Sequence, residues 1–116
     1  MTIHVHKFGG SCLSAVEDID AVVERIRESD GQKVVVVSAF RGITDRIIEQ
    51  IDFESTTPNE AFTASIELEH LERVPEIATS PWCIRFADTL HHLSSCLESY
   101  RELPDIEVRA DALACG

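Results

Sequence analysis

Four consecutive valines at positions 34–37 constrain the fold of this chain more than any other feature. An alternation of apolar and polar residues would indicate a strand with one face in water. An unbroken run of β-branched residues is instead typical of a strand covered on both faces, as in a parallel sheet. The segment 33–38 is therefore predicted to be a buried strand of an α/β protein.

A second strand is predicted near the N-terminus, over residues 2–8. A helix lies between the two strands, and its start is predicted at a capping box formed by Ser14 and Glu17. Gly31 is expected to end this helix. Residues 1–40 are therefore predicted to form a β–α–β unit. The helix has one apolar stripe, formed by Val16, Ile19, Val22, Val23 and Ile26.

Residues 44–103 are predicted to be helical, in three helices. The first begins near Thr44, which could act as its cap. The second follows another capping box at 57–60, with proline at the first helical position. The third begins at Ser80 and ends near Leu103. Its apolar residues repeat at three- and four-residue steps, which predicts a narrow buried seam of Phe86, Leu90, Leu93, Leu97 and Tyr100.

The C-terminal stretch 105–116 allows two interpretations. Residues 106–108 could form a strand, or Asp111 could cap a further helix. A parallel sheet of two strands is not a stable unit by itself. The chain is therefore expected to be the front portion of a larger α/β domain.

The segment from Lys7 to Ser11 can bind phosphate. Gly9 and Gly10 let main-chain N–H groups approach an anion without a side chain in the way. A following helix presents unpaired N–H groups and the positive end of its dipole, and Lys7 adds a full charge. A tight strand-to-helix turn with a solvated lysine would explain the same residues. Ser38 lies at the end of the second strand. It could cap the segment that follows, or it could belong to the phosphate site, and both interpretations stay open.

Composition excludes several function classes. The formal net charge is −11, from 21 acidic and 10 basic residues, which argues against nucleic acid and anionic membranes as partners. No apolar run has the length of a membrane span, and no signal peptide is predicted. The four cysteines contain no C-x-x-C pair and could form two disulfides. The size, the acidity and the lack of a secretion signal favour reduced thiols and a cytoplasmic location. No metal site is predicted. An acidic cluster is expected to form a solvated helix face, and its members are Glu67, Glu69, Glu72 and Glu76.

Several segments resemble aspartate kinases, in the amino-acid kinase superfamily. Residues 6–11 (His-Lys-Phe-Gly-Gly-Ser) resemble the opening signature of that family, and residues 34–45 are similar to its second glycine-containing loop, at a fitting distance. The stretch 57–100 resembles the helical insertion that follows, and 111–116 the run before a Gly-Glu motif. The resemblance covers essentially the whole chain but half or less of a catalytic domain. It implies part of a three-layer α/β/α fold with a parallel sheet, with 1–116 as the N-terminal portion.

The resemblance also implies a reaction, in which the γ-phosphoryl group of MgATP is transferred to the side-chain carboxylate of L-aspartate. ATP and Mg²⁺ are the implied cofactors, and Lys7 is the implied catalytic residue, in contact with the phosphates. Contacts to ATP would come from Lys7, Gly9, Gly10, Ser11, Ser38 and Ala39, and contacts to aspartate from Ser38 and Thr44. Arg41 departs from the family pattern, because a smaller residue is common there.

The resemblance further implies that important parts lie beyond this sequence. The family's substrate-binding glutamate would follow Gly116, and the nucleotide-binding half would come later. We therefore expect the chain to be inactive alone, and to act with a C-terminal half or as a homo-oligomer. Two alternatives remain: a non-catalytic α/β module that self-associates through the 86–100 seam, and an anion-binding regulatory protein that keeps only the 7–11 segment.

Overall fold

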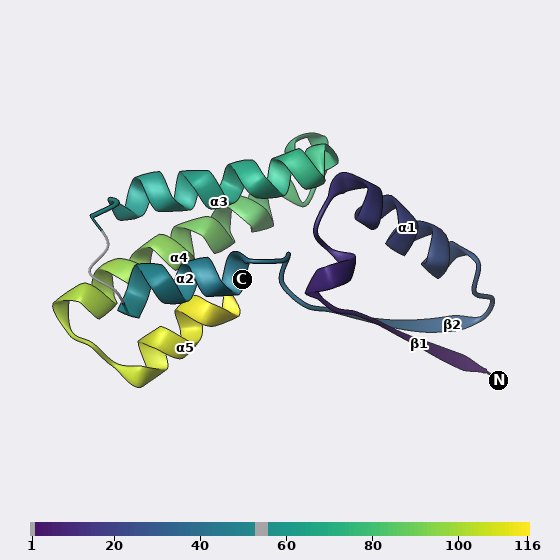
Figure 1. The fold of residues 1–116 in the computed structure, drawn as a ribbon, viewed down its shortest axis with the longest axis horizontal. Coiled ribbons are helices and arrows are strands. Elements are labelled where there is room, and N and C mark those ends of the chain that lie inside the picture. The colour runs from purple at the N-terminus through teal and green to yellow at the C-terminus, as the bar shows by residue number, and fades with distance from the viewer. Residues whose placement is uncertain (1, 53–55) are drawn as a thin grey trace. The chain divides into compact units, whose positions relative to one another are not determined.

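The structure is a computed structural model that describes residues 2–52 and 56–116. The chain divides into two compact units, unit 1 (1–42) and unit 2 (43–116). Unit 1 contains both strands, and the regular elements of unit 2 within its described residues are all helices (Figure 1). The mixture of helices with a parallel two-stranded sheet is compatible with the α/β class, whereas the three-layer arrangement stays a prediction.

Unit 1 is the β–α–β unit that the sequence predicts. Strand β1 (Ile3–Phe8) is followed by the short 3₁₀ turn η1 (Gly10–Cys12), helix α1 (Val16–Arg27) and strand β2 (Gln32–Val37). The strands are parallel, and their ends differ from the predicted ones by a single residue. In the register, Ile3 lies opposite Gln32 and Phe8 opposite Val37. Both strands therefore end at the same edge of the sheet.

Helix α1 begins with a cap that differs from the predicted one. Ala15 is extended (φ −125°, ψ 170°) and is the last residue before the helix. The Asp18 carboxylate accepts hydrogen bonds from the N–H groups of Ala15 (2.8 Å) and Ser14 (3.2 Å). The predicted pairing of Ser14 with Glu17 is wrong, because the helix starts one residue later and places Asp18 at the third helical position.

The valine strand is not covered on both faces, contrary to the prediction. Val34–Val37 are between 43% and 59% exposed, and Val5 of β1 is 69% exposed. One face of the sheet carries His6, which is hydrogen-bonded to Ser29 just after α1 (2.8 Å). The alternation of strand side chains puts Ile3, Val5 and Lys7 on the opposite face. The sheet has two strands within the described residues, too few to bury a valine run of this kind.

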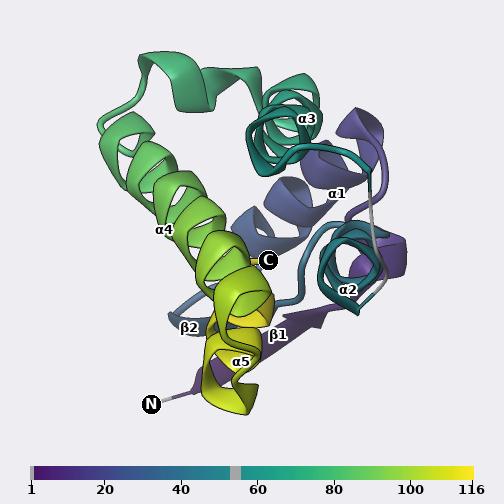
Figure 2. The same ribbon diagram turned by 90° about the vertical axis from the view of Figure 1, so that its left-hand side faces the viewer.

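Unit 2 contains α2 (Ile43–Asp52), α3 (Asn59–Arg73), the 3₁₀ turn η2 (Pro75–Thr79), α4 (Cys83–Glu102) and α5 (Ile106–Ala114). Helix α4 packs against α3 and α5, and α2 packs against α4 and α5 (Figures 1 and 2). The predicted seam on α4 is confirmed at Leu93 and Leu97, which are each 2% exposed, whereas its other three residues are half-buried. The core of the unit is formed by Ile43, Ile47, Phe62, Ile66, Leu93, Cys96, Leu97 and Ala112.

Both interpretations of the C-terminal stretch are wrong. Residues 106–114 are helical, and Asp105, not Asp111, caps the helix: its Oδ1 accepts from the N–H of Glu107 (2.7 Å). In this helix Ala112 lies in the core with no exposed surface. A strand over residues 106–108 would not include Ala112. An extended Asp105 after Pro104 provides the start signal.

The starts of three other helices also differ from prediction. Helix α4 begins at Cys83 and not at Ser80, because Pro81 and Trp82 form a turn. Helix α2 begins at Ile43, so Thr44 lies inside its first turn and is not its cap. Helix α3 begins at Asn59, one residue after the predicted proline position. Asn59 is buried, and its Oδ1 accepts a hydrogen bond from Gln50 Nε2 (3.1 Å). This contact joins α2 to α3 and satisfies a buried amide.

Candidate functional site

Two loops meet at the carboxyl ends of the paired strands in unit 1. The first loop, 9–13, follows β1, and the second, 38–42, follows β2. The N–H of Ser38 donates to the carbonyl of Phe8 (3.1 Å), and the N–H of Arg41 donates to the carbonyl of Leu13 (3.2 Å). The loops are thus joined by backbone hydrogen bonds at two points. Ligands of open α/β sheets bind at this edge.

Lys7 stands at this edge on the face away from Ser29. It lies opposite Val36 in the register, and in a parallel pair such residues project to the same face. Ser38 follows Val36 by two residues, so alternation assigns it to that face as well. Lys7 is exposed, and among the described residues no carboxylate lies within ion-pair distance of its amine.

The fold does not require glycine at positions 9 and 10, because a side chain could be accommodated at both. Gly9 is extended (φ −86°, ψ 177°), and a Cβ added there would have no atom within 4 Å. A Cβ on Gly10 would meet Arg41 Cα at 3.6 Å, an ordinary contact, and neither residue has a positive φ. Gly42 differs, because its φ of +86° favours glycine for backbone reasons. The glycine pair therefore keeps side chains away from the loop without being needed to build it.

The remaining predicted residues divide between the units. Ser11 is exposed in η1, and Ala39 is half-buried, with its carbonyl oxygen 3.9 Å from the added Cβ of Gly10. The Ser38 hydroxyl donates to the Ala39 carbonyl (3.0 Å). The structure thus brings the two predicted loops of unit 1 together. Thr44 lies exposed in unit 2, and its role as a substrate contact stays a prediction.

The contribution of helix α1 to anion binding stays a prediction. Helix α1 starts four residues after η1 ends, and the N–H groups of Ser14 and Ala15 just before it donate to the Asp18 carboxylate. A carboxylate of the chain itself already complements this helix end.

Leu13 is a residue of the site that the sequence interpretation missed. It is 4% exposed, its N–H donates to Gly10 (3.1 Å), and its carbonyl accepts from Arg41. Leu13 therefore holds the first loop against the second. The sequence did contain a signal for this role, because Leu13 is a large apolar residue that follows the glycine turn and does not belong to the apolar stripe of the helix.

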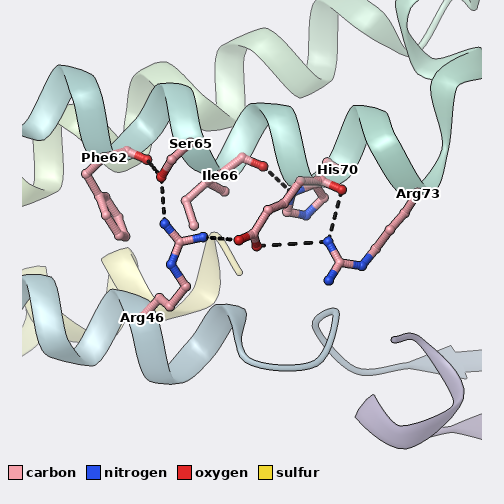
Figure 3. Close-up of polar contacts among 7 residues, drawn as sticks. Arg46, Phe62, Ser65, Ile66, His70 and Arg73 are labelled. Atoms are coloured by element: carbon pink, nitrogen blue, oxygen red, sulfur yellow. Dashed lines mark hydrogen bonds and ion pairs between the residues drawn. The ribbon is translucent and has the colours of Figure 1, made fainter. Parts of the chain in front are cut away.

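Unit 2 contains a polar cluster that joins α2 to α3 (Figure 3). Arg46 forms an ion pair with Glu69, and its Nη2 donates to Ser65 Oγ (2.6 Å). Its guanidinium also lies 5.6 Å from the ring centroid of Phe62. Arg73 approaches the other Glu69 oxygen at 3.9 Å. Glu69 is therefore not part of a solvated face, as the sequence predicted, because Arg46 on the neighbouring helix reaches it.

Neither a metal cluster nor a membrane helix is found within residues 2–52 and 56–116. No three His, Cys, Asp or Glu side chains of this region lie close enough together to hold a metal ion. No helix of the described chain combines the length and apolar character needed to cross a bilayer.

Comparison with known proteins bears directly on these loops. The model of the amino acid kinase family matches residues 2–113. The chain is 29% identical to an aspartokinase of Pseudomonas aeruginosa over 131 aligned positions, covering 98% of this chain and 31% of that protein. It is 37% identical to a Helicobacter pylori aspartokinase over 79 positions (66% of this chain, 18% of that one). An aspartokinase of Chlamydia pneumoniae is 36% identical over 93 positions (77% and 21%).

The chain spans less than a third of the length of these relatives. The family match nevertheless includes both strands, both loops and all the helices of unit 2 almost to the end of α5. This chain belongs to the amino acid kinase family.

Proposed function

We propose that this chain is the phosphate- and substrate-binding part of an aspartate kinase, which transfers the γ-phosphoryl group of MgATP to the side-chain carboxylate of L-aspartate. Family membership and the naming of the relatives as aspartokinases support the reaction class. The observation that carries the proposal is the glycine pair at 9–10. Its backbone does not require glycine, and it lies open beside Lys7, which forms no ion pair with the residues that the structure describes.

The proposed roles follow from what phosphoryl transfer needs. Charge spreads over the transferring group in the transition state, so catalysis depends on positioning and on electrostatic stabilisation. Lys7 would neutralise charge on the phosphates, while main-chain N–H groups of Gly9, Gly10 and Ser11 approach them. Ser38 and Ala39 would line the site from the second loop. Thr44 and Ser38 would contact aspartate.

Magnesium would enter with the nucleotide in this proposal. Mg²⁺ keeps several waters and is commonly held by substrate phosphates with one or two carboxylates. That mode of binding fits a chain whose described residues offer no cluster of three ligating side chains. The free thiols of all four cysteines fit the proposed cytoplasmic location.

We further propose that the chain does not complete a phosphoryl transfer by itself. The exposed valines of the sheet support this, because such a strand is typically covered in a finished parallel sheet. The same exposed face favours one alternative, a module that self-associates. The α4 seam first considered for pairing packs within unit 2, so association would have to use the sheet.

Titration of the chain with MgATP by calorimetry tests the phosphate site. The chain has two lysines, Lys7 and Lys33, which form a matched pair: both are exposed on strands and remove one charge when replaced by alanine. A hydrogen bond to a charged group contributes about 1.5–3 kcal/mol. Lys7→Ala should therefore weaken MgATP binding about 10- to 100-fold, and Lys33→Ala should change it less than twofold.

Equal effects of the two substitutions would show that Lys7 does not contact the phosphates. Catalysis is tested separately, by supplying a C-terminal aspartokinase segment and measuring formation of aspartyl phosphate. Recovery that depends on Lys7 supports the kinase proposal. Full activity of the Lys7→Ala protein in this mixture contradicts the assigned role.

A further inference from the structure

Arg41 is a cation beside the glycine pair, and the roles proposed above do not use it. It lies in the second loop of unit 1 and is exposed. A Cβ added to Gly10 would lie 3.6 Å from the Arg41 Cα and 3.9 Å from the Arg41 Cβ. The side chain of Arg41 therefore leaves the backbone directly beside the first loop.

The backbone of Arg41 is held in this position by contacts on both sides. Its N–H donates to the carbonyl of Leu13 (3.2 Å), and Leu13 is buried. The next residue, Gly42, has a φ of +86°, a turn conformation that glycine adopts readily. The start of the Arg41 side chain is therefore fixed, while its long flexible stem lets the guanidinium reach a ligand bound at Gly10.

The other arginines of unit 1 already have carboxylate partners. Arg25 lies 3.6 Å from Glu28, and Arg27 lies 3.0 Å from Glu24. Arg41 forms no ion pair with any residue that the structure describes. Its guanidinium is therefore not committed to a carboxylate within the described chain.

The acidic residues of unit 1 are placed away from the two loops in the sequence. All six lie between positions 17 and 30, so neither 9–13 nor 38–42 contains one. The carboxylate of Asp18 accepts hydrogen bonds from the N–H groups before α1. Asp45, the acidic residue nearest to Arg41 in the sequence, belongs to α2 of unit 2. Lys7 and Arg41 thus put positive charge at the loops of a chain whose formal net charge is −11.

On the basis of the phosphate site proposed above, we propose that Arg41 is a second cation of that site and binds the phosphate chain of the nucleoside triphosphate. A guanidinium is planar and can bind two phosphate oxygens at once, whereas an ammonium group acts as a point charge. Lys7 would contact the phosphates from the end of β1, and Arg41 from the second loop. Two cations favour a chain of phosphates over a single phosphate, because the chain carries more negative charge and offers oxygens at more than one position.

Calorimetric titration of the full chain with inorganic tripolyphosphate and Mg²⁺ tests this role. Tripolyphosphate presents the phosphate chain without the nucleoside, and orthophosphate should bind more weakly. Arg41→Gln should weaken tripolyphosphate binding about tenfold, because charge-assisted hydrogen bonds are lost. Arg41→Lys keeps the charge but not the planar fork, and it should weaken binding less than the glutamine variant does.

Arg25→Gln is the matched control for this titration. It removes the same charge from an exposed residue of the same unit, on the last turn of α1 and outside both loops. It should change tripolyphosphate binding less than about twofold, because salt screens distant charges. Circular dichroism checks that the variants keep their helix content. As a second readout, tripolyphosphate should shift the NMR signals of the Gly9 and Gly10 amides and of the Arg41 Nε–H in the wild-type chain.

Lys7→Ala, titrated in the same way, separates the role of Arg41 from the phosphate site as a whole. Weaker binding after Lys7→Ala with unchanged binding after Arg41→Gln would keep the site and overturn the role of Arg41. No binding of tripolyphosphate by the wild-type chain would overturn both.

Three other results would also overturn the role of Arg41. Equal weakening by Arg41→Gln and Arg25→Gln would show a general effect of charge. Tighter binding after Arg41→Gln would show that the side chain obstructs the loop. Equal affinity of the wild-type chain for orthophosphate and tripolyphosphate would show that a second cation does not take part.

Discussion

At the scale of single residues, the glycines of the two loops differ in whether the backbone requires glycine. Gly42 has a φ of +86°, which a side chain disfavours. Gly9 has an ordinary extended backbone and open space around its missing Cβ. Backbone geometry explains Gly42, whereas the backbone of Gly9 does not require glycine, and the proposed phosphate contact would account for it.

This difference predicts opposite results for two alanine substitutions. Gly9→Ala should keep or raise the free energy of unfolding, by up to about 1 kcal/mol, because alanine restricts the unfolded chain. It should also weaken MgATP binding, since the methyl group enters the phosphate space. Gly42→Ala should lower the free energy of unfolding by about 1–2 kcal/mol, the cost of a left-handed backbone.

Urea denaturation of both variants measures the free energy of unfolding, and calorimetry measures MgATP binding. If Gly9→Ala destabilises the protein and leaves MgATP binding intact, the open space serves the fold and the ligand argument fails.

At the scale of elements, side chains from different helices position α2. Arg46 joins α2 to α3 through Glu69, and Arg109 of α5 binds Asp52 at the end of α2 through two hydrogen bonds (3.0 and 2.7 Å). Both ion pairs are partly exposed, so water screens them. Thr44 lies in the first turn of the same helix, so these contacts set its orientation within unit 2.

A double-mutant cycle with Arg46→Met and Glu69→Gln should give a coupling energy of about 1 kcal/mol, at the upper end for partly exposed pairs. The exposed pair Arg27 and Glu24 within α1 is the control, with a distance of 3.0 Å. Its coupling energy should stay below about 0.5 kcal/mol. Urea denaturation measures both coupling energies. Equal values for the two pairs would show that an ion pair between helices stabilises the protein no more than one within a helix.

The Asp52 pair predicts a pH dependence of stability. Hydrogen bonds from Arg109 lower the pKa of the Asp52 carboxyl below its ordinary value of 3.8. A lowered pKa in the folded state stabilises the protein above the unfolded value, and this contribution is lost as the pH falls through the folded one. Wild-type protein should therefore melt higher than Asp52→Asn at pH 5–7, and the difference should shrink below about pH 4.

Thermal melts from pH 2 to pH 7 measure this difference. Asp88→Asn on α4 is the control, because Asp88 is exposed and no cation pairs with it in the described chain. A melting difference for Asp52→Asn that stays constant down to pH 2 would contradict the ion-pair explanation.

At the scale of the whole molecule, the two units bury their apolar residues unequally. Unit 2 has a core of fully buried side chains, whereas the strands of unit 1 expose Ile3, Val5 and Val34–Val37. Exposed apolar surface of this kind marks an interface or a site of aggregation. The isolated chain should accordingly bind a hydrophobic dye and associate as its concentration rises.

Replacing Val5 and Val34 together by threonine should reduce both effects, because the two residues are paired across the strands. Sedimentation velocity and dye fluorescence measure the change, with Val23→Thr on α1 as a single-site control. A dispersed monomer that binds no dye would show that the strands are already covered. A stable dimer that ignores MgATP would favour the self-associating module over the kinase part.

Much of the fold and of the candidate site could be predicted because the signals are local. A valine run, a glycine pair and helical periodicity each depend on neighbouring residues, and they predicted β1, β2 and the α4 seam correctly. The loops at 9–13 and 38–42 could also be expected to meet, since parallel strands end at one edge. The helix starts were less predictable, because moving the α1 cap from Ser14 to Ala15 changes which carboxylate binds it.

The sequence by itself determined the β–α–β unit, the glycine loop beside Lys7 and the family to which the chain belongs. Only the tertiary structure decided that the valines stay exposed, that Glu69 pairs with Arg46, and that residues 106–114 form a helix. The physical reason is that burial and ion pairing depend on partners far away in the chain. Which residues become partners is decided when the helices pack, and a local sequence pattern does not specify them.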